Sequence, residues 1–288
     1  MPPPQPPDPT DPPGFVVLVE PGDRIHFQDW GGRGEPGVVL VHGLAASSWT
    51  WAPVARRLTA ARHTVALDLR GHGLSDAPTE PGAYDLDVLG SDVVAVAEGS
   101  GLLTEGEAVV VAGHGFGAIV AAEAAGQLGD RCARLVLVDG GLDRLEDATG
   151  LDADEFLRGL DEPPEVMASM AGYLADRRSW DPGSWDPDQE RAARAVVVET
   201  PAGRLVSATR PHALEAAVRA MFGYDPADAL GRVAAPIVAV RRITPGDETA
   251  TLAGAAAPPG IDVVEVAAPG HNLPRYRPDD VTAAILGR

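Results

Sequence analysis

The sequence predicts an α/β fold built on a mostly parallel sheet, and three features of the chain support this class. Short apolar runs, many of them rich in valine, recur along the chain, as expected for strands buried on both faces of a parallel sheet. Helical patterns separate these runs, and this alternation of strand and helix is typical of parallel sheets. The length of 288 residues is enough for one large α/β domain, or for one domain that carries an insertion.

Eight apolar runs are predicted to be strands. The first two, FVVLV at 15–19 and RIHFQDW at 24–30, follow one another closely and are expected to form a hairpin. The other six are predicted at 38–42, 64–68, 108–112, 134–139, 236–240 and 261–266. Helical patterns lie between them at 53–61, 86–99, 116–127 and 278–286.

The regular alternation is interrupted between about Gly140 and Arg232. This stretch has little strand signal, but it has helical patterns at 153–160, 165–175, 189–198 and 211–222. Because strand patterns resume at Pro236, we interpret residues 140–232 as a helical cap inserted into a core of residues 15–139 and 233–288. An independent helical domain is the alternative. The segment holds most of the large apolar residues outside the sheet, namely Phe156, Met167, Met170, Trp180, Trp185, Met221 and Phe222.

The first 14 residues, MPPPQPPDPTDPPG, are predicted to be a disordered proline-rich tail. They have no basic start and no apolar segment, so they do not resemble a signal peptide. The chain also has no apolar run of the roughly 20 residues that a membrane span requires. One cysteine, Cys132, excludes an internal disulfide and a cysteine-based metal cluster, and fits a reducing cytoplasm. We therefore expect a cytoplasmic protein.

The net charge of −19 arises from 42 acidic residues against 23 basic residues, all of which are arginine. Such a surface repels nucleic acid and anionic membranes. The absence of lysine excludes a pyridoxal-phosphate Schiff base and a Walker-A phosphate loop, since both require that amine. The expected partner is a small-molecule substrate or ligand, and homodimerisation is left open.

The stretch VVVAGHGFGAIVAAEAA, at 109–125, changes from a strand pattern through a glycine-rich turn into a helix pattern. A Gly-x-Ser-x-Gly turn at such a place presents a serine nucleophile, but here the middle position is Gly115. Residues 113–118 also fit the dinucleotide fingerprint Gly-x-Gly-x-x-Gly/Ala, and Asp139 follows where a ribose-binding acid would lie. That fingerprint normally belongs to the first strand–helix–strand unit, whereas here a hairpin and two further strands precede it.

Three other motifs remain unexplained by dinucleotide binding. The His-Gly turn in LVHGLAASSWTW, at 40–51, can direct the backbone N–H of Leu44 toward the top of the sheet, as an oxyanion hole requires. DLRGHGLSDAP, at 68–78, follows the fourth strand. APGHNLPRYRP, at 268–278, places His271 in a loop between the last strand and the last helix.

In this order and on these elements, the motifs resemble the α/β-hydrolase superfamily over roughly residues 15–287. The sequence is most similar to the capped branch that includes esterases, lactonases, haloperoxidase-like enzymes and epoxide hydrolases. The resemblance implies the α/β-hydrolase fold, a mostly parallel eight-stranded sheet flanked by helices with an inserted helical cap. It also implies that the turn at 113–117 is the nucleophile elbow.

The resemblance assigns roles to several residues. His271 would be the general base, and the backbone N–H groups of Leu44 and Phe116 would form the oxyanion hole. Asp247, after the seventh strand, is the preferred acid to orient the imidazole, and Asp139, at the end of the sixth strand, is the alternative. The residues expected to contact the substrate are His42, Gly43 and His114.

Gly115 departs from the family pattern, because without a side chain it cannot form an acyl-enzyme or an alkyl-enzyme. We expect weak or non-covalent hydrolysis of a small apolar ester, lactone or similar carbonyl compound, with His271 as base and no metal or cofactor. A catalytically inactive binding or scaffold protein is the alternative, as in the N-Myc-downstream-regulated proteins, non-hydrolytic relatives with glycine at the elbow. A dinucleotide-binding oxidoreductase that uses Gly113–Ala118 is a remote third possibility.

Overall fold

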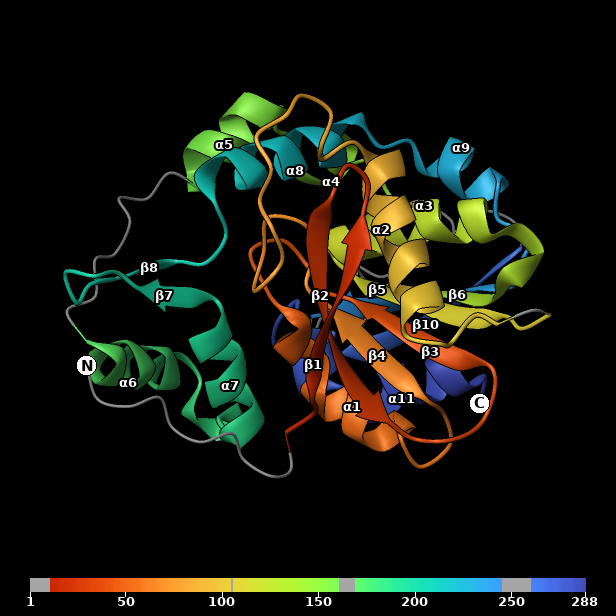
Figure 1. The fold of residues 1–288 in the computed structure, drawn as a ribbon, viewed down its shortest axis with the longest axis horizontal. Coiled ribbons are helices and arrows are strands. Elements are labelled where there is room, and N and C mark those ends of the chain that lie inside the picture. The colour runs from red at the N-terminus through yellow and green to blue at the C-terminus, as the bar shows by residue number, and fades with distance from the viewer. Residues whose placement is uncertain (1–10, 105, 161–168, 245–259) are drawn as a thin grey trace.

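The computed structural model describes residues 11–104, 106–160, 169–244 and 260–288, and eight of the strands in these ranges form one sheet (Figure 1). The strand order is β1-β2-β4-β3-β5-β6-β9-β10, in which β1 pairs antiparallel with β2, β2 pairs antiparallel with β4, and the remaining pairs are parallel. All eight predicted strands are therefore confirmed, with small shifts at their ends. They are β1 (Gly14–Val19), β2 (Asp23–Gly31), β3 (Gly37–Val41), β4 (Thr64–Leu67), β5 (Val109–His114), β6 (Cys132–Val138), β9 (Ile237–Ile243) and β10 (Ile261–Ala267).

Helices cover both faces of the sheet and bury alternate residues of its central strands. On β3, Val39 and Val41 belong to the apolar cluster that includes α2 (Leu86–Gly99) and α3 (Phe116–Leu128). Val38 and Leu40 face the opposite way, into the cluster that includes α1 (Ala52–Leu58) and α11 (Pro278–Leu286). Because side chains alternate along a strand, a strand buried on both faces must be apolar throughout, which explains the continuous runs in the sequence.

The described residues between β6 and β9, with a gap at 161–168, form six α-helices, which confirms the predicted helical character of most of them. Two of them, α5 and α8, pack together, while α6 and α7 lie with a small hairpin in a separate lobe, on the left in Figure 1. The helices are α4 (Leu145–Thr149), α5 (Ala153–Leu160), α6 (Met170–Trp180), α7 (Pro187–Ala195), α8 (Pro211–Gly223) and α9 (Pro226–Gly231).

The helix predicted at 189–198 was wrong at its end. Val197 and Val198, expected at the end of a helix, belong to β7 (Val197–Glu199), which pairs antiparallel with β8 (Leu205–Ser207). β-Branched valine favours the extended chain, but strands of three residues are too short to produce a recognisable alternation in the sequence. The predicted ranges also did not include the short helices α4 and α9, nor η1 (Ser48–Trp51), η2 (Gly129–Arg131), η3 (Pro182–Ser184) and α10 (Leu273–Tyr276).

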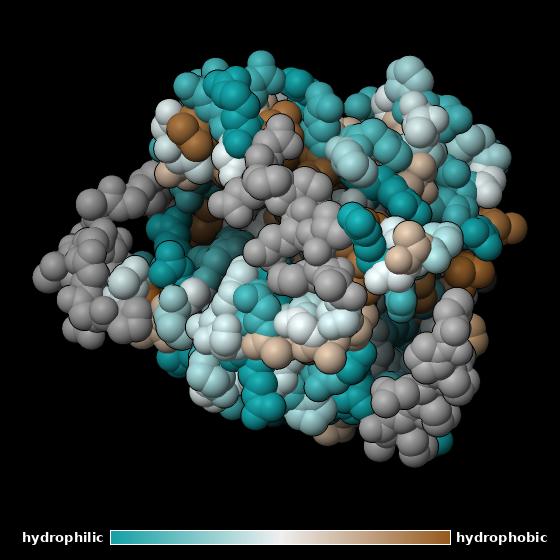
Figure 2. All heavy atoms as spheres, turned by 90° about the vertical axis from the view of Figure 1, so that its left-hand side faces the viewer, coloured by the Kyte–Doolittle hydropathy of each residue, from teal (hydrophilic) through white to brown (hydrophobic). Residues whose placement is uncertain are grey.

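The segment predicted as a tail is ordered at its end. Gly14 is the first residue of β1, and the carboxylate of Asp11 forms an ion pair of 2.6 Å with Arg191 of α7. Residues 1–10 lie outside the described part of the chain. The surface on the side of the α6–α7 lobe is mostly hydrophilic, with apolar side chains visible in a hollow between the upper and lower parts of that face (Figure 2). None of the helices in the described ranges is long and apolar enough to cross a membrane.

Candidate active site

The turn between β5 and α3 has the sharp geometry expected of a nucleophile elbow. Gly115 adopts φ 55° and ψ −117°, and its N–H donates a hydrogen bond of 3.0 Å to the carbonyl of Val138 at the end of β6. This backbone conformation is strained for a residue with a side chain and costs glycine little. The elbow is therefore present, although the residue at its apex has no nucleophilic group.

The neighbouring glycines allow chain segments to approach one another closely. A Cβ on Gly113 would lie 2.0 Å from the carbonyl oxygen of Gly117, and a Cβ on Gly117 would lie 2.3 Å from the carbonyl oxygen of Val41. In a dinucleotide-binding turn, the second glycine of the fingerprint, here Gly115, leaves room for the pyrophosphate of the cofactor. The imidazole of His271 lies in that space, since a Cβ on Gly115 would be 2.9 Å from its Nε2, so the geometry favours the elbow over the dinucleotide site.

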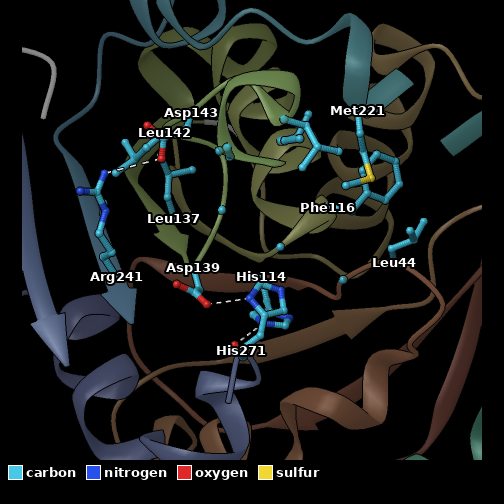
Figure 3. A pocket seen from close by; sticks show the side chains of 18 of the residues that line it. Leu44, His114, Phe116, Leu137, Asp139, Leu142, Asp143, Met221, Arg241 and His271 are labelled. Carbon is cyan, nitrogen blue, oxygen red and sulfur yellow. Dashed lines mark hydrogen bonds and ion pairs between the residues drawn. The ribbon is translucent and has the colours of Figure 1, made fainter. Parts of the chain in front are cut away.

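His271 extends from the loop between β10 and α10 toward the elbow. Its Nδ1 lies 2.6 Å from Oδ2 of Asp139, which follows β6 (Figure 3). Because an ionised carboxylate accepts hydrogen bonds, Nδ1 carries the proton and Nε2 keeps its lone pair. A Cβ built on Gly115 would lie 2.9 Å from that Nε2. The predicted convergence of His271 and Gly115 is confirmed.

Asp139 is well placed to hold the imidazole. Its backbone has φ 48°, an uncommon value that Asp tolerates better than most residues, and its Oδ1 accepts a hydrogen bond of 2.9 Å from the N–H of Arg242. Burial raises the pKa of this carboxyl, but the hydrogen bonds from His271 and Arg242 outweigh burial and leave the pKa below its usual value. The alternative acid of the sequence analysis thus contacts His271, whereas the preferred one, Asp247, lies outside the described residues.

His114 lies beneath His271 and lines the same cavity. Its Nε2 lies 3.0 Å from the backbone oxygen of His271, to which it donates, and the two ring centroids are 4.5 Å apart. Burial, aided by the neighbouring imidazole of His271, lowers the pKa of His114 to about 4. A neutral His114 therefore holds the loop that carries His271, and any contact with substrate remains a prediction.

His42 is buried away from the cavity, so the prediction that it contacts the substrate was wrong. Its Nδ1 donates to the carbonyl of Gly43 at 2.8 Å, and its Nε2 accepts from the N–H of Leu69 at 3.0 Å. With both ring nitrogens used and the side chain fully buried, His42 can only brace the turn. Gly43 itself does line the cavity.

These residues open into a cavity of about 720 Å³ with mostly apolar walls. Leu44 and Phe116, the predicted oxyanion-hole residues, both line it together with Gly115 and His271. Phe116 is the first residue of α3, where backbone N–H groups have no acceptor within the helix. The other apolar lining residues are Ala46, Ile119, Leu137, Leu142, Leu145, Ala148, Phe156, Met221, Ala239 and Val240.

The polar side of the cavity includes residues that the sequence analysis missed. Arg241 of β9 and Asp143, after β6, form an ion pair of 3.7 Å on the cavity wall (Figure 3). Thr50 and Asn272 line the cavity as well. A charged residue at the carboxyl end of a buried strand, as in IVAVRRI at 237–243, is the signal that could have revealed Arg241, because such ends form sites in parallel sheets.

The large apolar residues of the segment between β6 and β9 are divided between two places. Phe156 and Met221 line the cavity at the elbow, whereas Trp180 and Trp185 line a second cavity of about 670 Å³ between α6, α7 and α10. Ala46 lines both cavities. In the described ranges, no three His, Cys, Asp or Glu side chains gather as a metal ion would require.

The site combines three features of hydrolases with an α/β fold. They are a base held by a carboxylate, an elbow after β5 and an apolar cavity at the carboxyl ends of the strands. The family model described as "Alpha/beta hydrolase family" matches residues 38–285. The chain belongs to this family.

Individual relatives match more narrowly than the family model. Epoxide hydrolase 4 of Mus musculus is 34% identical over 107 residues, which cover 37% of this chain and 29% of that protein. N-formylmaleamate deformylase of Pseudomonas putida is 37% identical over 118 residues, 41% of this chain and 42% of that protein. The matches therefore span less than half of either relative. The crystal structure of E-2-(acetamidomethylene)succinate hydrolase superposes with a TM-score of 0.78 at 21% identity, covering 96% of this chain and 98% of that one, which shows a shared fold.

Proposed function

We propose that this protein hydrolyses a small, largely apolar ester, lactone or similar carbonyl compound without a covalent intermediate. The observation that carries the proposal is the position of His271, whose Nε2 faces the elbow while its Nδ1 is held by Asp139. A general base in this position can act on water where a serine would otherwise stand. Gly115 excludes the acyl-enzyme route.

In the proposed reaction, Nε2 of His271 takes a proton from a water molecule as the water oxygen attacks the carbonyl carbon. The backbone N–H groups of Leu44 and Phe116 then stabilise the negative charge on the carbonyl oxygen. Asp139 stabilises the imidazolium, which returns the proton to the leaving group as the tetrahedral intermediate breaks down.

The site must open slightly to admit that water. The imidazole of His271 approaches the elbow closely, but its side chain is 58% exposed and has space to turn aside. An oxyanion hole and a base without a nucleophile retain only part of the catalytic power of a triad, roughly 10³–10⁴ over water. We therefore expect slow turnover of activated substrates.

The substrate class follows from the walls of the cavity. Leu44, Phe116 and Met221 surround the approach to the elbow with apolar surface, which favours an apolar acyl or ring group. The names of the relatives, epoxide hydrolase and N-formylmaleamate deformylase, support a hydrolytic reaction on a small molecule.

Hydrolysis of p-nitrophenyl acetate, p-nitrophenyl butyrate and γ-butyrolactone tests the proposal. His271→Ala should reduce hydrolysis to the rate in buffer. His63→Ala is the matched control, because His63 forms a similar pair with Asp29 at 2.8 Å outside the cavity, and it should retain the full rate. Equal rates for the wild type and His271→Ala on all three substrates would replace hydrolysis with a binding-only function.

A further inference from the structure

The imidazole of His271 occupies space that a nucleophile would need. A Cβ built on Gly115 would lie 2.9 Å from Nε2 of His271, shorter than the usual contacts of a Cβ, and 3.5 Å from Cε1 of the same ring. The next neighbour of that Cβ would be Cα of Gly43, at 3.9 Å. Among the atoms near that Cβ position, Nε2 of the base is therefore the nearest to the reaction space above the elbow.

The groups that remain at the elbow meet the two requirements for removing a proton beside a carbonyl. One requirement is a nitrogen with a free lone pair, which Nε2 of His271 supplies when the Asp139 carboxylate holds the ring proton on Nδ1. The other is stabilisation of the enolate oxygen, which the N–H groups of Leu44 and Phe116, two residues that line the cavity, would provide. Hydrolysis has a third requirement, a water molecule placed between base and substrate.

We propose that His271 also removes a proton from the carbon next to the carbonyl of a small, apolar ketone. The C–H bond breaks, its proton passes to Nε2, and its electron pair moves into the carbonyl group to give an enolate. The enolate then takes a proton back from the imidazolium, or a deuteron once the imidazolium has exchanged with heavy water. The cycle needs no oxidant, reductant or co-reactant.

The shape of the cavity favours this class of substrate. Its walls are mostly apolar, and its volume of about 720 Å³ accommodates a compact ketone. Such a ketone can place its oxygen at the amides of Leu44 and Phe116 while its neighbouring carbon touches Nε2 of His271. The inference rests on the same base and oxyanion hole as the proposed hydrolysis, but it needs no hydrolysable bond.

Deuterium incorporation, followed by NMR in D₂O, tests this activity with three probes, phenylacetone, acetophenone and cyclohexanone. Because general base catalysis typically contributes about 10²–10⁴-fold, the wild type should exchange at least one probe about 100-fold faster than His271→Ala. Asp139→Asn should lose most of the acceleration. His63→Ala, which keeps the protein's other groups and removes only a histidine outside the cavity, should exchange as fast as the wild type.

Gly115→Ala tests whether the position of the His271 imidazole matters, because this variant keeps the imidazole but moves it. The added Cβ must displace the imidazole by several tenths of an ångström but leaves His271 and Asp139 intact, so exchange should slow markedly in a variant that remains folded. If no probe exchanges faster than in buffer, or if His271→Ala exchanges as fast as the wild type, the inference is wrong.

The hydrolysis assay shows which proposal has failed. Hydrolysis without exchange overturns this inference and leaves the proposed function intact. Exchange without hydrolysis supports the inference and removes the proposed hydrolysis. Loss of both means that His271 does not act as a base.

Discussion

Asp139 and His271, 132 positions apart in the chain, are joined by a hydrogen bond of 2.6 Å between Oδ2 and Nδ1. The partner carboxylate oxygen, Oδ1, is bound by the N–H of Arg242 on β9. Two neighbouring strands, β6 and β9, thus fix the carboxylate, and the carboxylate fixes the ring. The orientation of the base therefore depends on the edge of the sheet and not on the exposed loop that carries it.

Asp139→Asn should reduce kcat/KM for ester hydrolysis by roughly 10²–10⁴-fold. The amide cannot stabilise the imidazolium, and its N–H₂ group favours the wrong tautomer of His271. Asparagine tolerates the backbone conformation at 139, so the variant should fold, which circular dichroism can check. Asp29→Asn, which alters the His63 pair outside the cavity, is the control and should keep its activity. A fully active Asp139→Asn would contradict this role.

Gly115→Ser should gain labelling by a fluorophosphonate and a burst in p-nitrophenyl acetate hydrolysis. The new Cβ would lie 2.9 Å from Nε2 of His271, so the exposed ring must shift before Oγ can be activated. Gly115→Ala introduces the same Cβ and the same backbone strain without the hydroxyl, and should gain neither property. Both variants should lose about 1 kcal/mol in the free energy of unfolding.

The gain in Gly115→Ser should disappear when His271→Ala is added. Intact-mass spectrometry after treatment with the probe distinguishes these cases, because only an activated serine adds the phosphonyl group. A folded Gly115→Ser protein that is not labelled would show that the remainder of the site no longer supports serine chemistry.

The free energy of unfolding should decrease as the pH falls from about 6.5. Burial lowers the pKa of His114 to about 4 and that of His72 to about 3 in the folded protein, with further lowering from neighbouring His271 and His42 respectively. In the unfolded chain both groups titrate near 6.5, so the unfolded state binds the proton first and is stabilised relative to the folded state on acidification. Each histidine contributes a slope of up to about 1.4 kcal/mol per pH unit, and its contribution is lost once the pH reaches the folded pKa.

Urea unfolding at several pH values between 7 and 5 measures this slope. His114→Gln removes one of the buried histidines whose pKa is lowered, and it should give a shallower slope than the wild type. Identical slopes for the wild type and His114→Gln would show that His114 does not titrate differently in the folded and unfolded states.

Calorimetry with millimolar NAD or FAD should show no binding. The imidazole of His271 takes the space above Gly115, where the fingerprint would place the pyrophosphate, since a Cβ on Gly115 would lie 2.9 Å from its Nε2. Micromolar affinity for either dinucleotide would contradict the assignment of this turn as an elbow. Loss of dinucleotide binding in Gly113→Val would not identify the binding site, because the Cβ of valine would collide with the backbone and disrupt the turn itself.

The sequence by itself determined the strands, the main helices and the positions of Gly115 and His271. Strands buried on both faces must be apolar at every position, so their runs are visible without any knowledge of their neighbours. The elbow is likewise local, because its glycines are spaced by the geometry of one strand-to-helix turn. By contrast, the three-residue strands β7 and β8 depend on each other for their existence, and the helical prediction failed there.

Only the tertiary structure decided which groups surround the base. Asp139 meets His271, Arg241 meets Asp143, and His42 turns away from the cavity, although nothing in the spacing of these residues distinguishes them. The reason is physical: parallel strands bring their carboxyl ends to one edge, but strand order and loop path determine which side chains come within hydrogen-bond distance. The approach of His271 to within 2.9 Å of a Cβ position on Gly115 also depends on the tertiary structure, since β6, β9, β10 and the segment between β6 and β9 separate these two loops in the sequence.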